Sequence, residues 1–233
     1  MPPKKFTIAH IALRPPCPLA WDGATWGDLP SLPIDRFRPE GSTHHPRTRV
    51  KLAWTSEGLC GLFEVLDKYV RCTRTHFQDD VYKDSCVELF LRPKAENGYF
   101  NFEFNCGGTL LASYITDPTR TETGFKAFTR LSPVQGEQVE VFHSMPKVVA
   151  PELREETLWH LGFFIPFGLL ESCVGPLGPI GGQSWRANLY KCADDSSHPH
   201  WGAWSPVDAL NFHLPHCFGV LDFAPQMATQ PSG

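Results

Sequence analysis

Seven polar side chains recur at alternate positions of three segments that the sequence predicts to be β-strands. Side chains alternate between the two faces of a strand, so each segment places its polar set on one face. If the strands are neighbours, one sheet face carries Glu88, Asn101, Glu103, Asn105, Arg186, Asn188 and Tyr190. Acids, amides and a guanidinium are the donors and acceptors that bind vicinal hydroxyl groups. The pattern favours a ligand-binding surface and a solvated sheet face about equally, because antiparallel sheets commonly keep one face in water.

Aromatic side chains in predicted loops could form a platform for the C–H face of a sugar. Those outside the alternating core positions are Tyr82, Trp201, Trp204 and Phe212. Packing beneath a loop is the more frequent role of any one such ring. Their number nevertheless favours at least one exposed ring beside the polar face.

Glu88 and Glu103 could also be the acid and base of a glycoside hydrolase, since cross-strand carboxylates can lie about 5 to 9 Å apart. Arg186 on the same face disfavours this interpretation, because a guanidinium neighbour would hold a carboxylate ionised. The sequence has no GxSxG, HExxH or phosphate-binding glycine loop. We therefore assign no catalytic residues, and an enzyme, if this were one, would hydrolyse O-glycosyl compounds.

Histidine and cysteine spacings give little support for a metal site. His198 and His200 form an HxH pair, and His213 and His216 form an HxxH pair. These spacings could ligate zinc, but a third ligand at a fixed spacing is missing. The eight cysteines include no CxxC pair, and buried free thiols are the favoured interpretation. We predict no zinc site, and the metal ligands stay unassigned.

Short strands joined by turns are the elements that must position these residues. The chain has 19 glycines and 22 prolines without a repeat period, which is typical of many turns and little helix. We expect strands over residues 5–11, 49–54, 59–66, 85–92, 99–106, 110–115, 139–143, 159–165, 184–192 and 219–223, the first of them at a sheet edge. Residues 117–124 are predicted as a polar loop, 146–157 as a mobile insert and 166–173 as a short helix.

A chain of 233 residues with 42% hydrophobic residues can bury one large core. We expect an all-β fold, an antiparallel β-sandwich, in one soluble domain over residues 1–223 with a disordered tail over residues 224–233. The net charge of −4 and the scattered basic residues disfavour nucleic-acid binding. No apolar run approaches the roughly 20 residues needed to span a bilayer, and residues 1–20 lack a signal-peptide core. We therefore expect no nucleic-acid or membrane partner and a cytoplasmic location.

Four segments, in this order and spacing, resemble the family 9 carbohydrate-binding modules. They are residues 84–91 (DSCVELFL), 99–108 (YFNFEFNCGG), 185–192 (WRANLYKC) and 211–219 (NFHLPHCFG). The predicted hairpin over residues 49–67 and the turn at 21–23 extend the similarity over nearly the whole chain, which looks most like the stand-alone bacterial family 9-like proteins. The resemblance implies an immunoglobulin-like or jelly-roll sandwich of the DOMON-like group. It also implies non-catalytic binding of a mono- or oligosaccharide, in the service of carbohydrate catabolism.

The resemblance also implies roles for single residues. In the xylanase-borne modules, a glutamate of the first of these strands and polar residues of the next bind a terminal sugar held between two tryptophans. Glu88 matches that glutamate, and Asn105 matches a polar position in the next strand. Phe212 matches one tryptophan, whereas the other falls beside Tyr82. Those modules carry an arginine where this chain has Glu103, which suggests an exchanged ion pair between Glu103 and Arg186.

Established members of the family also hold calcium. No cofactor is expected to be required here, but calcium is possible, with Asp67, Asp79 and Asp80 as candidate ligands. Haem-binding electron-transfer domains also occur among DOMON relatives, and the residues available for axial ligation would be His143 and Met145. A structural scaffold that binds nothing is the remaining alternative.

Overall fold

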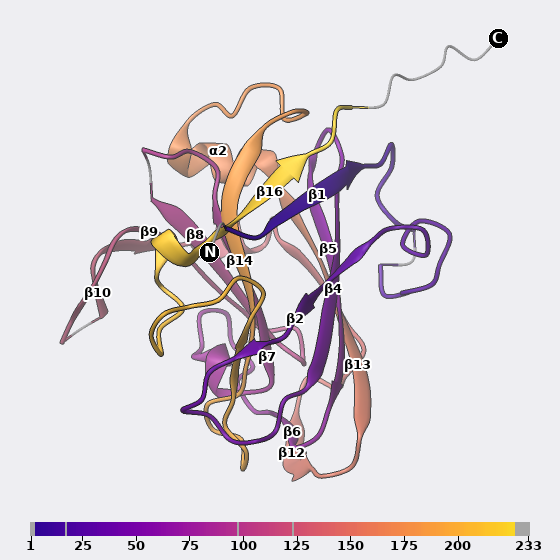
Figure 1. The fold of residues 1–233 in the computed structure, drawn as a ribbon, viewed down its shortest axis with the longest axis vertical. Helices are drawn as coiled ribbons and strands as arrows, with labels where there is room; N and C mark the ends of the chain where they lie inside the picture. Colours follow the sequence, from indigo (N-terminus) through magenta and orange to yellow (C-terminus); the bar gives the residue numbers. More distant parts are fainter. Residues whose placement is uncertain (1–2, 17, 97, 123, 227–233) are drawn as a thin grey trace.

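Two β-sheet layers pack face to face around an apolar core in the computed structural model, which describes residues 3–16, 18–96, 98–122 and 124–226 (Figure 1). One layer contains β16 (Gly219–Phe223), β14 (Ser184–Cys192), β7 (Cys86–Arg92), β8 (Tyr99–Asn105), β9 (Leu110–Thr121) and β10 (Gly124–Arg130). The other contains β2 (Ser31–Ile34), β4 (Arg47–Trp54), β5 (Gly58–Asp67), β13 (Thr157–Pro166) and β11 (Glu140–His143). The predicted all-β sandwich is confirmed.

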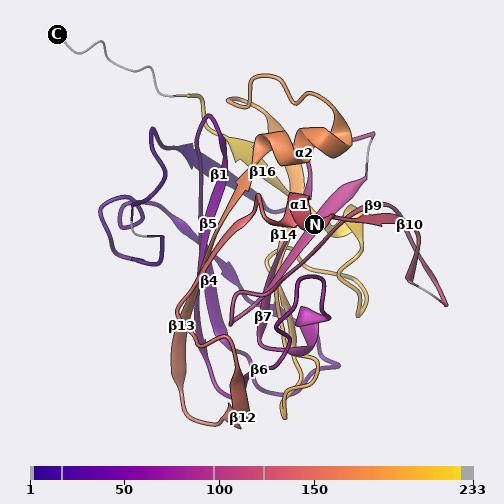
Figure 2. The same cartoon turned by 180° about the vertical axis from the view of Figure 1, so that it is seen from behind.

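Short elements complete the two layers. β15 (Trp201–Ala203) pairs with β14 on one side and β3 (Arg36–Phe37) on the other, and β12 (Val149–Leu153) pairs with β6 (Val70–Cys72). Figure 2 shows β12 beside β6 at the end of the molecule opposite the longer helix, α2 (Phe167–Val174). The other helical turns are α1 (Pro133–Gly136), η1 (Val81–Lys83) and η2 (Pro215–Cys217). None of the helices in the described part of the chain is long and apolar enough to cross a membrane.

Strand alternation places the apolar side chains of both layers in the core, as predicted. Phe100, Phe102 and Phe104 of β8 are fully buried there, and Phe104 stacks on Phe163 of β13 with 5.5 Å between the ring centroids. Large apolar side chains that fill the same space cost several kcal/mol when they are truncated. The core therefore fixes which face of β7 and β8 points away from it.

The pairing register brings the predicted polar set onto that outer face. Tyr190 of β14 lies opposite Glu88 of β7, which lies opposite Glu103 of β8. One row further along, Asn188 and Asn101 flank Phe90. The three strands are neighbours in the order β8-β7-β14, so the seven residues share one face as predicted. This face is nevertheless buried rather than solvated, because loops and turns from other parts of the chain cover it.

Three expectations about local structure are wrong. β1 (Lys5–His10) is not an edge strand, because it pairs in parallel with β16 on one side and β4 on the other (Figure 1). Residues 117–124 are not a loop, since most of them belong to the hairpin of β9 and β10, which projects from the sandwich. Residues 146–157, which were predicted as a mobile insert, instead contain β12, which pairs with β6. Polar strands exposed on both faces lack the apolar alternation that identifies strands in a sequence.

The remaining predicted elements agree with the structure to within a few residues. The predicted helix over residues 166–173 is α2, which ends at Val174. Gly175 follows it with a φ of 71°, a conformation that glycine adopts without the steric penalty of a β-carbon. In the predicted tail, residues 224–226 follow β16 without helix or strand. The rest of that tail, residues 227–233, lies outside the described residues, as does Cys17.

A buried ion pair links the two layers. Lys191 Nζ of β14 lies 3.1 Å from Asp67 Oδ2 at the end of β5, without an aligned hydrogen bond, and both side chains are fully buried. His44 Nε2 contacts the other oxygen of Asp67 at 2.7 Å. Burial raises the pKa of Asp67, but Lys191 and His44 outweigh it, so the net pKa is below the usual value. The carboxylate is therefore ionised opposite a buried ammonium group.

His200 completes this buried network as a neutral acceptor. Its Nδ1 lies 2.9 Å from the backbone carbonyl of His198 and therefore carries the proton. Lys191 Nζ donates to the unprotonated Nε2 at 2.8 Å. Burial, with Lys191 as the next cause, lowers the pKa of His200 to about 3. Lys191 is thus held by one anion and one neutral ring between the two layers.

Candidate functional site

A cavity of about 440 Å³ lies against the outer face of β7, β8 and β9. Its volume is in the range of small-molecule sites. The polar side chains that line it include Asp80, Glu88, Asn101, Glu103 and Asp194. The aromatic side chains that line it are Tyr82, Phe125, Phe128, Trp201 and Phe212, together with the ring of His213. A polar floor between aromatic walls can bind a ligand that has both hydroxyl groups and an apolar face.

The floor is formed by residues of adjacent strands. Asn101 Nδ2 donates to Glu103 Oε1 at 2.7 Å, while Asn101 Oδ1 accepts from the backbone N–H of Ser113 at 2.8 Å. The Cys192 thiol donates to Glu88 Oε1 at 3.1 Å. Both glutamates are almost fully buried, with exposed fractions of 2% for Glu88 and 4% for Glu103. Their side chains are held in place by neighbours on the same sheet face.

Burial dominates the electrostatics of the two floor carboxyls. It raises the pKa of Glu103 to about 7, against the lowering effect of the hydrogen bond from Asn101. It also raises the pKa of Glu88 well above its usual value, with Cys192 and Glu103 as further causes. Two carboxyls that face each other in a low-dielectric site cannot both ionise easily. The floor therefore carries less negative charge at neutral pH than its two acids would in water.

The wall formed by Phe212 is supported from behind by Tyr190. The two rings stack with 3.9 Å between their centroids, and the Tyr190 hydroxyl donates to the Phe212 backbone carbonyl at 2.9 Å. The neighbouring His213 contacts the Tyr99 hydroxyl through Nδ1 at 2.9 Å. Burial lowers the pKa of His213 to about 3, so its ring is neutral. Tyr190 thus positions a cavity wall and does not itself line the cavity.

Two other walls come from segments far apart in the sequence. Tyr82 belongs to η1 and Trp201 to β15, and the indole N–H of Trp201 donates to Asp194 Oδ1 at 2.7 Å. The β9–β10 hairpin contributes Phe125, over whose ring the Arg120 guanidinium lies at 4.2 Å. The cavity is thus closed by three separate segments around the sheet face.

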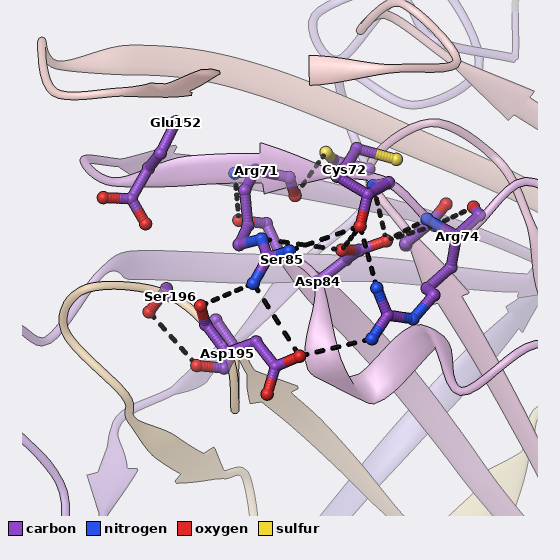
Figure 3. A network of polar contacts seen from close by, with 12 residues as sticks. Arg71, Cys72, Arg74, Asp84, Ser85, Glu152, Asp195 and Ser196 are labelled. Atoms are coloured by element: carbon purple, nitrogen blue, oxygen red, sulfur yellow. Dashed lines mark hydrogen bonds and ion pairs between the residues drawn. The ribbon is translucent and has the colours of Figure 1, made fainter. Parts of the chain in front are cut away.

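Asn105 holds a network beside the cavity and does not line it. Figure 3 shows Asp84 at the centre of this network, with Arg71 and Arg74 reaching toward Asp195. Asn105 Nδ2 donates to Asp84 Oδ2 at 3.0 Å, and the backbone N–H of Arg74 donates to the same oxygen at 2.8 Å. These contacts fix the segments that carry Tyr82 and Asp194, whose backbones are joined by a hydrogen bond of 3.1 Å.

Arg186 and Asn188 also lie outside the cavity lining, where they bind loop backbone. Asn188 Nδ2 donates to the carbonyl of Ser205 at 2.9 Å. The Arg186 guanidinium donates to the backbone carbonyls of Phe218 and His216. Of the nine residues predicted to bind ligand, the cavity therefore brings together five, which are Tyr82, Glu88, Asn101, Glu103 and Phe212. The other four support the surrounding loops and walls.

The expected ion pair between Glu103 and Arg186 is wrong. Arg186 lies opposite Arg92 in the register, whereas Glu103 lies opposite Glu88, two rows of same-face residues away. Contrary to expectation, Arg186 also does not keep a floor carboxylate ionised, since burial raises the pKa of both glutamates. The Arg186 guanidinium instead donates hydrogen bonds to backbone carbonyl oxygens.

Sequence reasoning missed the contribution of the β9–β10 hairpin to the cavity. Phe125 and Phe128 line it together with Arg120 and Arg130. Two phenylalanines three residues apart in an otherwise hydrophilic segment were the available signal, because a solvated loop seldom exposes large apolar rings. Trp204, in contrast, is a buried core residue, as expected for most loop aromatics.

The three aspartates named as calcium candidates do not fit a calcium ion. Asp67 faces the ammonium group of Lys191, Asp80 pairs with Lys83 Nζ at 3.1 Å, and Asp79 accepts from the backbone of Thr75 and His76. Calcium takes 6–8 oxygen ligands around one point, and these carboxylates do not converge. No step of ligand binding is therefore assigned to calcium.

Two other groups of side chains in the described part of the chain bring three potential metal ligands together. Cys86, Glu88 and Cys192 have ligand atoms within 4.8 Å of one another, and so do Asp208, His216 and Cys217. Of the histidine pairs in the sequence, His213 belongs to the cavity and His200 to the Lys191 network. Neither the HxH nor the HxxH pair therefore contributes both of its histidines to one group of potential metal ligands.

Comparison with solved structures finds the same β-sandwich fold in three of them. A candidate carbohydrate-binding protein from Bacteroides uniformis is 23% identical with a TM-score of 0.79, covering 95% of this chain and 99% of that chain. A family 9 module from Caldicellulosiruptor kristjanssonii, solved with glucose, is 13% identical with a TM-score of 0.62 over 98% of this chain and 100% of that chain. The same module solved with cellotriose is 14% identical with a TM-score of 0.65, covering 99% and 100% of the two chains.

The likeness to these structures shows a shared β-sandwich fold. The chain belongs to carbohydrate-binding family 9, whose model matches residues 26–223. A comparison with curated proteins gives no match.

Proposed function

We propose that the protein is a non-catalytic carbohydrate-binding domain that holds a mono- or oligosaccharide in the cavity above β7 and β8. The observation that carries the proposal is the pairing of a hydrogen-bonding floor with aromatic walls in one cavity of about 440 Å³. Membership of carbohydrate-binding family 9 supports it, as does the binding of glucose and cellotriose by a module of the same fold.

The chemistry of the cavity suits a sugar ring. Asn101, Glu103 and Asp80 offer donors and acceptors for hydroxyl groups, while Phe212 and Tyr82 offer ring faces for the C–H side of the sugar. Phe212 is held rigidly by the stacked ring of Tyr190, which reduces the entropy lost when a ligand binds. A preformed aromatic wall of this kind favours binding without a large conformational change.

The alternative functions gain no support from the family or the structural neighbours. A glycoside hydrolase would use Glu88 and Glu103, but the family that the chain matches is one of binding modules. A haem domain would need axial ligands at the cavity. His143 and Met145 do not line it, and His143 Nδ1 contacts the backbone carbonyl of Met145 at 2.7 Å.

A role in carbohydrate catabolism and a cytoplasmic location belong to the same proposal. The net charge of −4 supports a sugar rather than a nucleic acid as the partner. Cell fractionation with an antibody against the protein would test the location, and its recovery in the membrane or extracellular fraction would count against it.

Saturating cellotriose is expected to raise the melting temperature of the protein. A ligand at 100 times its dissociation constant stabilises the native state by about 2.7 kcal/mol, which corresponds to roughly 5 °C or more for a domain of this size. Differential scanning fluorimetry and isothermal titration calorimetry with glucose and cellotriose measure the effect. The absence of any shift or heat at millimolar sugar would contradict the proposal.

Two matched phenylalanine variants locate the binding site. Phe212→Ala removes a wall of the cavity and is expected to weaken sugar binding by about tenfold, since a ring contact contributes on the order of 1 kcal/mol. Phe142→Ala removes a ring of the same size from a second hollow, of about 360 Å³, and should leave the affinity unchanged. Equal losses in the two variants would show that the sugar does not bind against Phe212.

A further inference from the structure

The floor of the cavity contains a buried carboxylate oxygen without a partner. Glu103 Oε1 accepts from Asn101, but Oε2 has no hydrogen-bond partner although it is shielded from solvent. Glu103 itself is only 4% exposed and lines the cavity. A buried acceptor that is left unpaired costs about 1 to 3 kcal/mol and more when it is charged, so an oxygen of this kind marks the place where a ligand donor would be most favourable.

The two glutamates of the floor form no ion pair with a described basic residue, although Arg120 and Arg130 also line the cavity. Among the ion pairs between described residues, none includes Glu88, Glu103 or Asp194, and Lys83 is paired with Asp80. Arg120 and Arg130 line the cavity from the β9–β10 hairpin and are exposed, and the Arg120 guanidinium lies over the Phe125 ring. Arg120 lowers the pKa of Glu103, but it forms no ion pair with that residue. Four acids therefore line one cavity, and three of them have no basic partner.

The titratable and charged groups that face Glu103 come from every element around it. They are Glu88 and Cys86 of β7, Tyr99 of β8, Asp80 and Tyr82 of the η1 segment, Arg120 of β9 and Asp194 after β14. Cys192 of β14, Arg130 of β10 and His213 line the same cavity. Burial is the largest cause that raises the pKa of Glu103 to about 7, and Asp194 and Asp80 raise it further. A carboxyl with a pKa near neutrality ionises at little cost when a cation arrives beside it.

The walls favour a cation as well. Ring faces of tyrosine, tryptophan and phenylalanine attract an ammonium group through the negative potential of their π-systems, and Tyr82, Trp201 and Phe212 surround the floor. An ammonium group also offers three donors and neutralises the carboxylate, whereas a sugar hydroxyl offers one donor and no charge. The missing partner of the floor is therefore better supplied by an amine than by a hydroxyl group.

We propose that the preferred ligand of this cavity is a saccharide with a protonated amino group, such as a 2-amino-2-deoxy sugar, whose ammonium group pairs with the free oxygen of Glu103. This inference rests on the proposed function and names the class of sugar that the site selects. It predicts that binding strengthens as the pH rises from 5 to 7, because Glu103 then ionises. The gain ends where the amine of the ligand loses its own proton.

Three ligands with one ring skeleton test the proposal: glucosamine, N-acetylglucosamine and glucose, followed by their trisaccharides. Calorimetry of the whole protein at pH 7 in low salt with EDTA is expected to show at least about tenfold tighter binding of the glucosamine ligands than of the uncharged ones. EDTA keeps divalent metal ions away from the thiol and carboxyl groups of Cys86, Glu88 and Cys192. The preference is expected to shrink at pH 5.

Glu103→Gln is the diagnostic variant, and Glu156→Gln is its matched control at an exposed position outside the cavity lining. The first should lose the preference for amino sugars by about tenfold, measured as the ratio of the affinities for the glucosamine and the glucose ligands in the same variant, because the neutral amide no longer pairs with the ammonium group. The second should leave this ratio unchanged. Retention of the preference in Glu103→Gln would overturn the assignment to this carboxylate.

The outcomes separate this inference from the proposed function. Binding of cellotriose with no gain for the glucosamine trisaccharide would overturn the amino-sugar preference and leave carbohydrate binding intact. Failure of all the sugars to bind would overturn both. Binding of the glucosamine ligands alone would support both, since those ligands are themselves carbohydrates.

Discussion

Replacing Lys191 with methionine is expected to destabilise the protein by about 3 to 5 kcal/mol, which is the usual cost of removing one partner from a buried ion pair. Methionine keeps most of the volume of the lysine side chain, so the loss of stability measures the contribution of the ammonium charge. Without the ammonium group, Asp67 keeps only His44 and remains between the two layers in a fully buried position. Urea unfolding at pH 7 measures the change in the free energy of unfolding.

The pH dependence of this effect follows from the pKa of Asp67, which is lowered in the native protein mainly by Lys191 and His44 against the opposing effect of burial. A lowered native pKa stabilises the fold at pH values above the unfolded pKa of about 3.9, and this contribution is lost as the pH falls through the native pKa. In the variant, Asp67 instead protonates readily. The difference between the variant and the natural protein should therefore narrow as the pH falls toward 4.

Two controls accompany the Lys191 variant. Lys126→Met removes the partner of an exposed pair with Asp117 and should cost no more than about 1 kcal/mol, because surface pairs contribute little. The double variant Asp67→Asn, Lys191→Met removes both charges and should be more stable than Lys191→Met alone. Additive effects of the two substitutions would show that the charges do not interact.

Glu103→Gln is expected to stabilise the protein at pH 8 by about 3 kcal/mol and to change little at pH 4.5. Burial raises the native pKa of Glu103 from 4.5 to about 7. Because the native pKa is raised, the fold favours the protonated form of Glu103. The contribution of this residue to stability is therefore fully present below the unfolded pKa and is lost as the pH rises through about 7. This difference between the native and the unfolded pKa corresponds to about 3 kcal/mol of unfolding free energy.

Unfolding of the natural protein and of Glu103→Gln across this pH range measures the prediction. Glu156→Gln, at an exposed position, should follow the natural protein throughout. A stability difference that does not grow with pH would mean that Glu103 is solvated or paired. Together with the expected loss of amino-sugar preference, the variant would show a binding site maintained at a cost in stability.

Alternation made the polar face predictable because it depends only on neighbouring residues within one strand. The period of two placed Glu88, Asn101 and Glu103 on the face opposite Phe102 and Phe104, and the register confirms it. The strands β7, β8 and β14 carry strong apolar patterns, so their bounds were also predictable.

What covers that face was not predictable in the same way, since it depends on contacts between distant segments. Asn188 and Arg186 share the face with Glu88, but they bind backbone carbonyls of Ser205 and Phe218 in loops whose paths the alternation does not describe. The β9–β10 hairpin was missed because its exposed strands need no apolar alternation. Local patterns thus indicated the floor of the cavity, and only the tertiary structure defined its walls.

The position of β1 between β16 and β4 has a consequence for synthesis on the ribosome. Lys5 lies opposite Val220, so the first and the last strands of the described residues pair with each other. Closing so long a loop carries a large entropic cost, and folds dominated by such contacts form slowly. We therefore expect the sandwich to close only after β16 has left the ribosome. Until then, the edge of β1 that faces β16 in the folded protein stays unpaired.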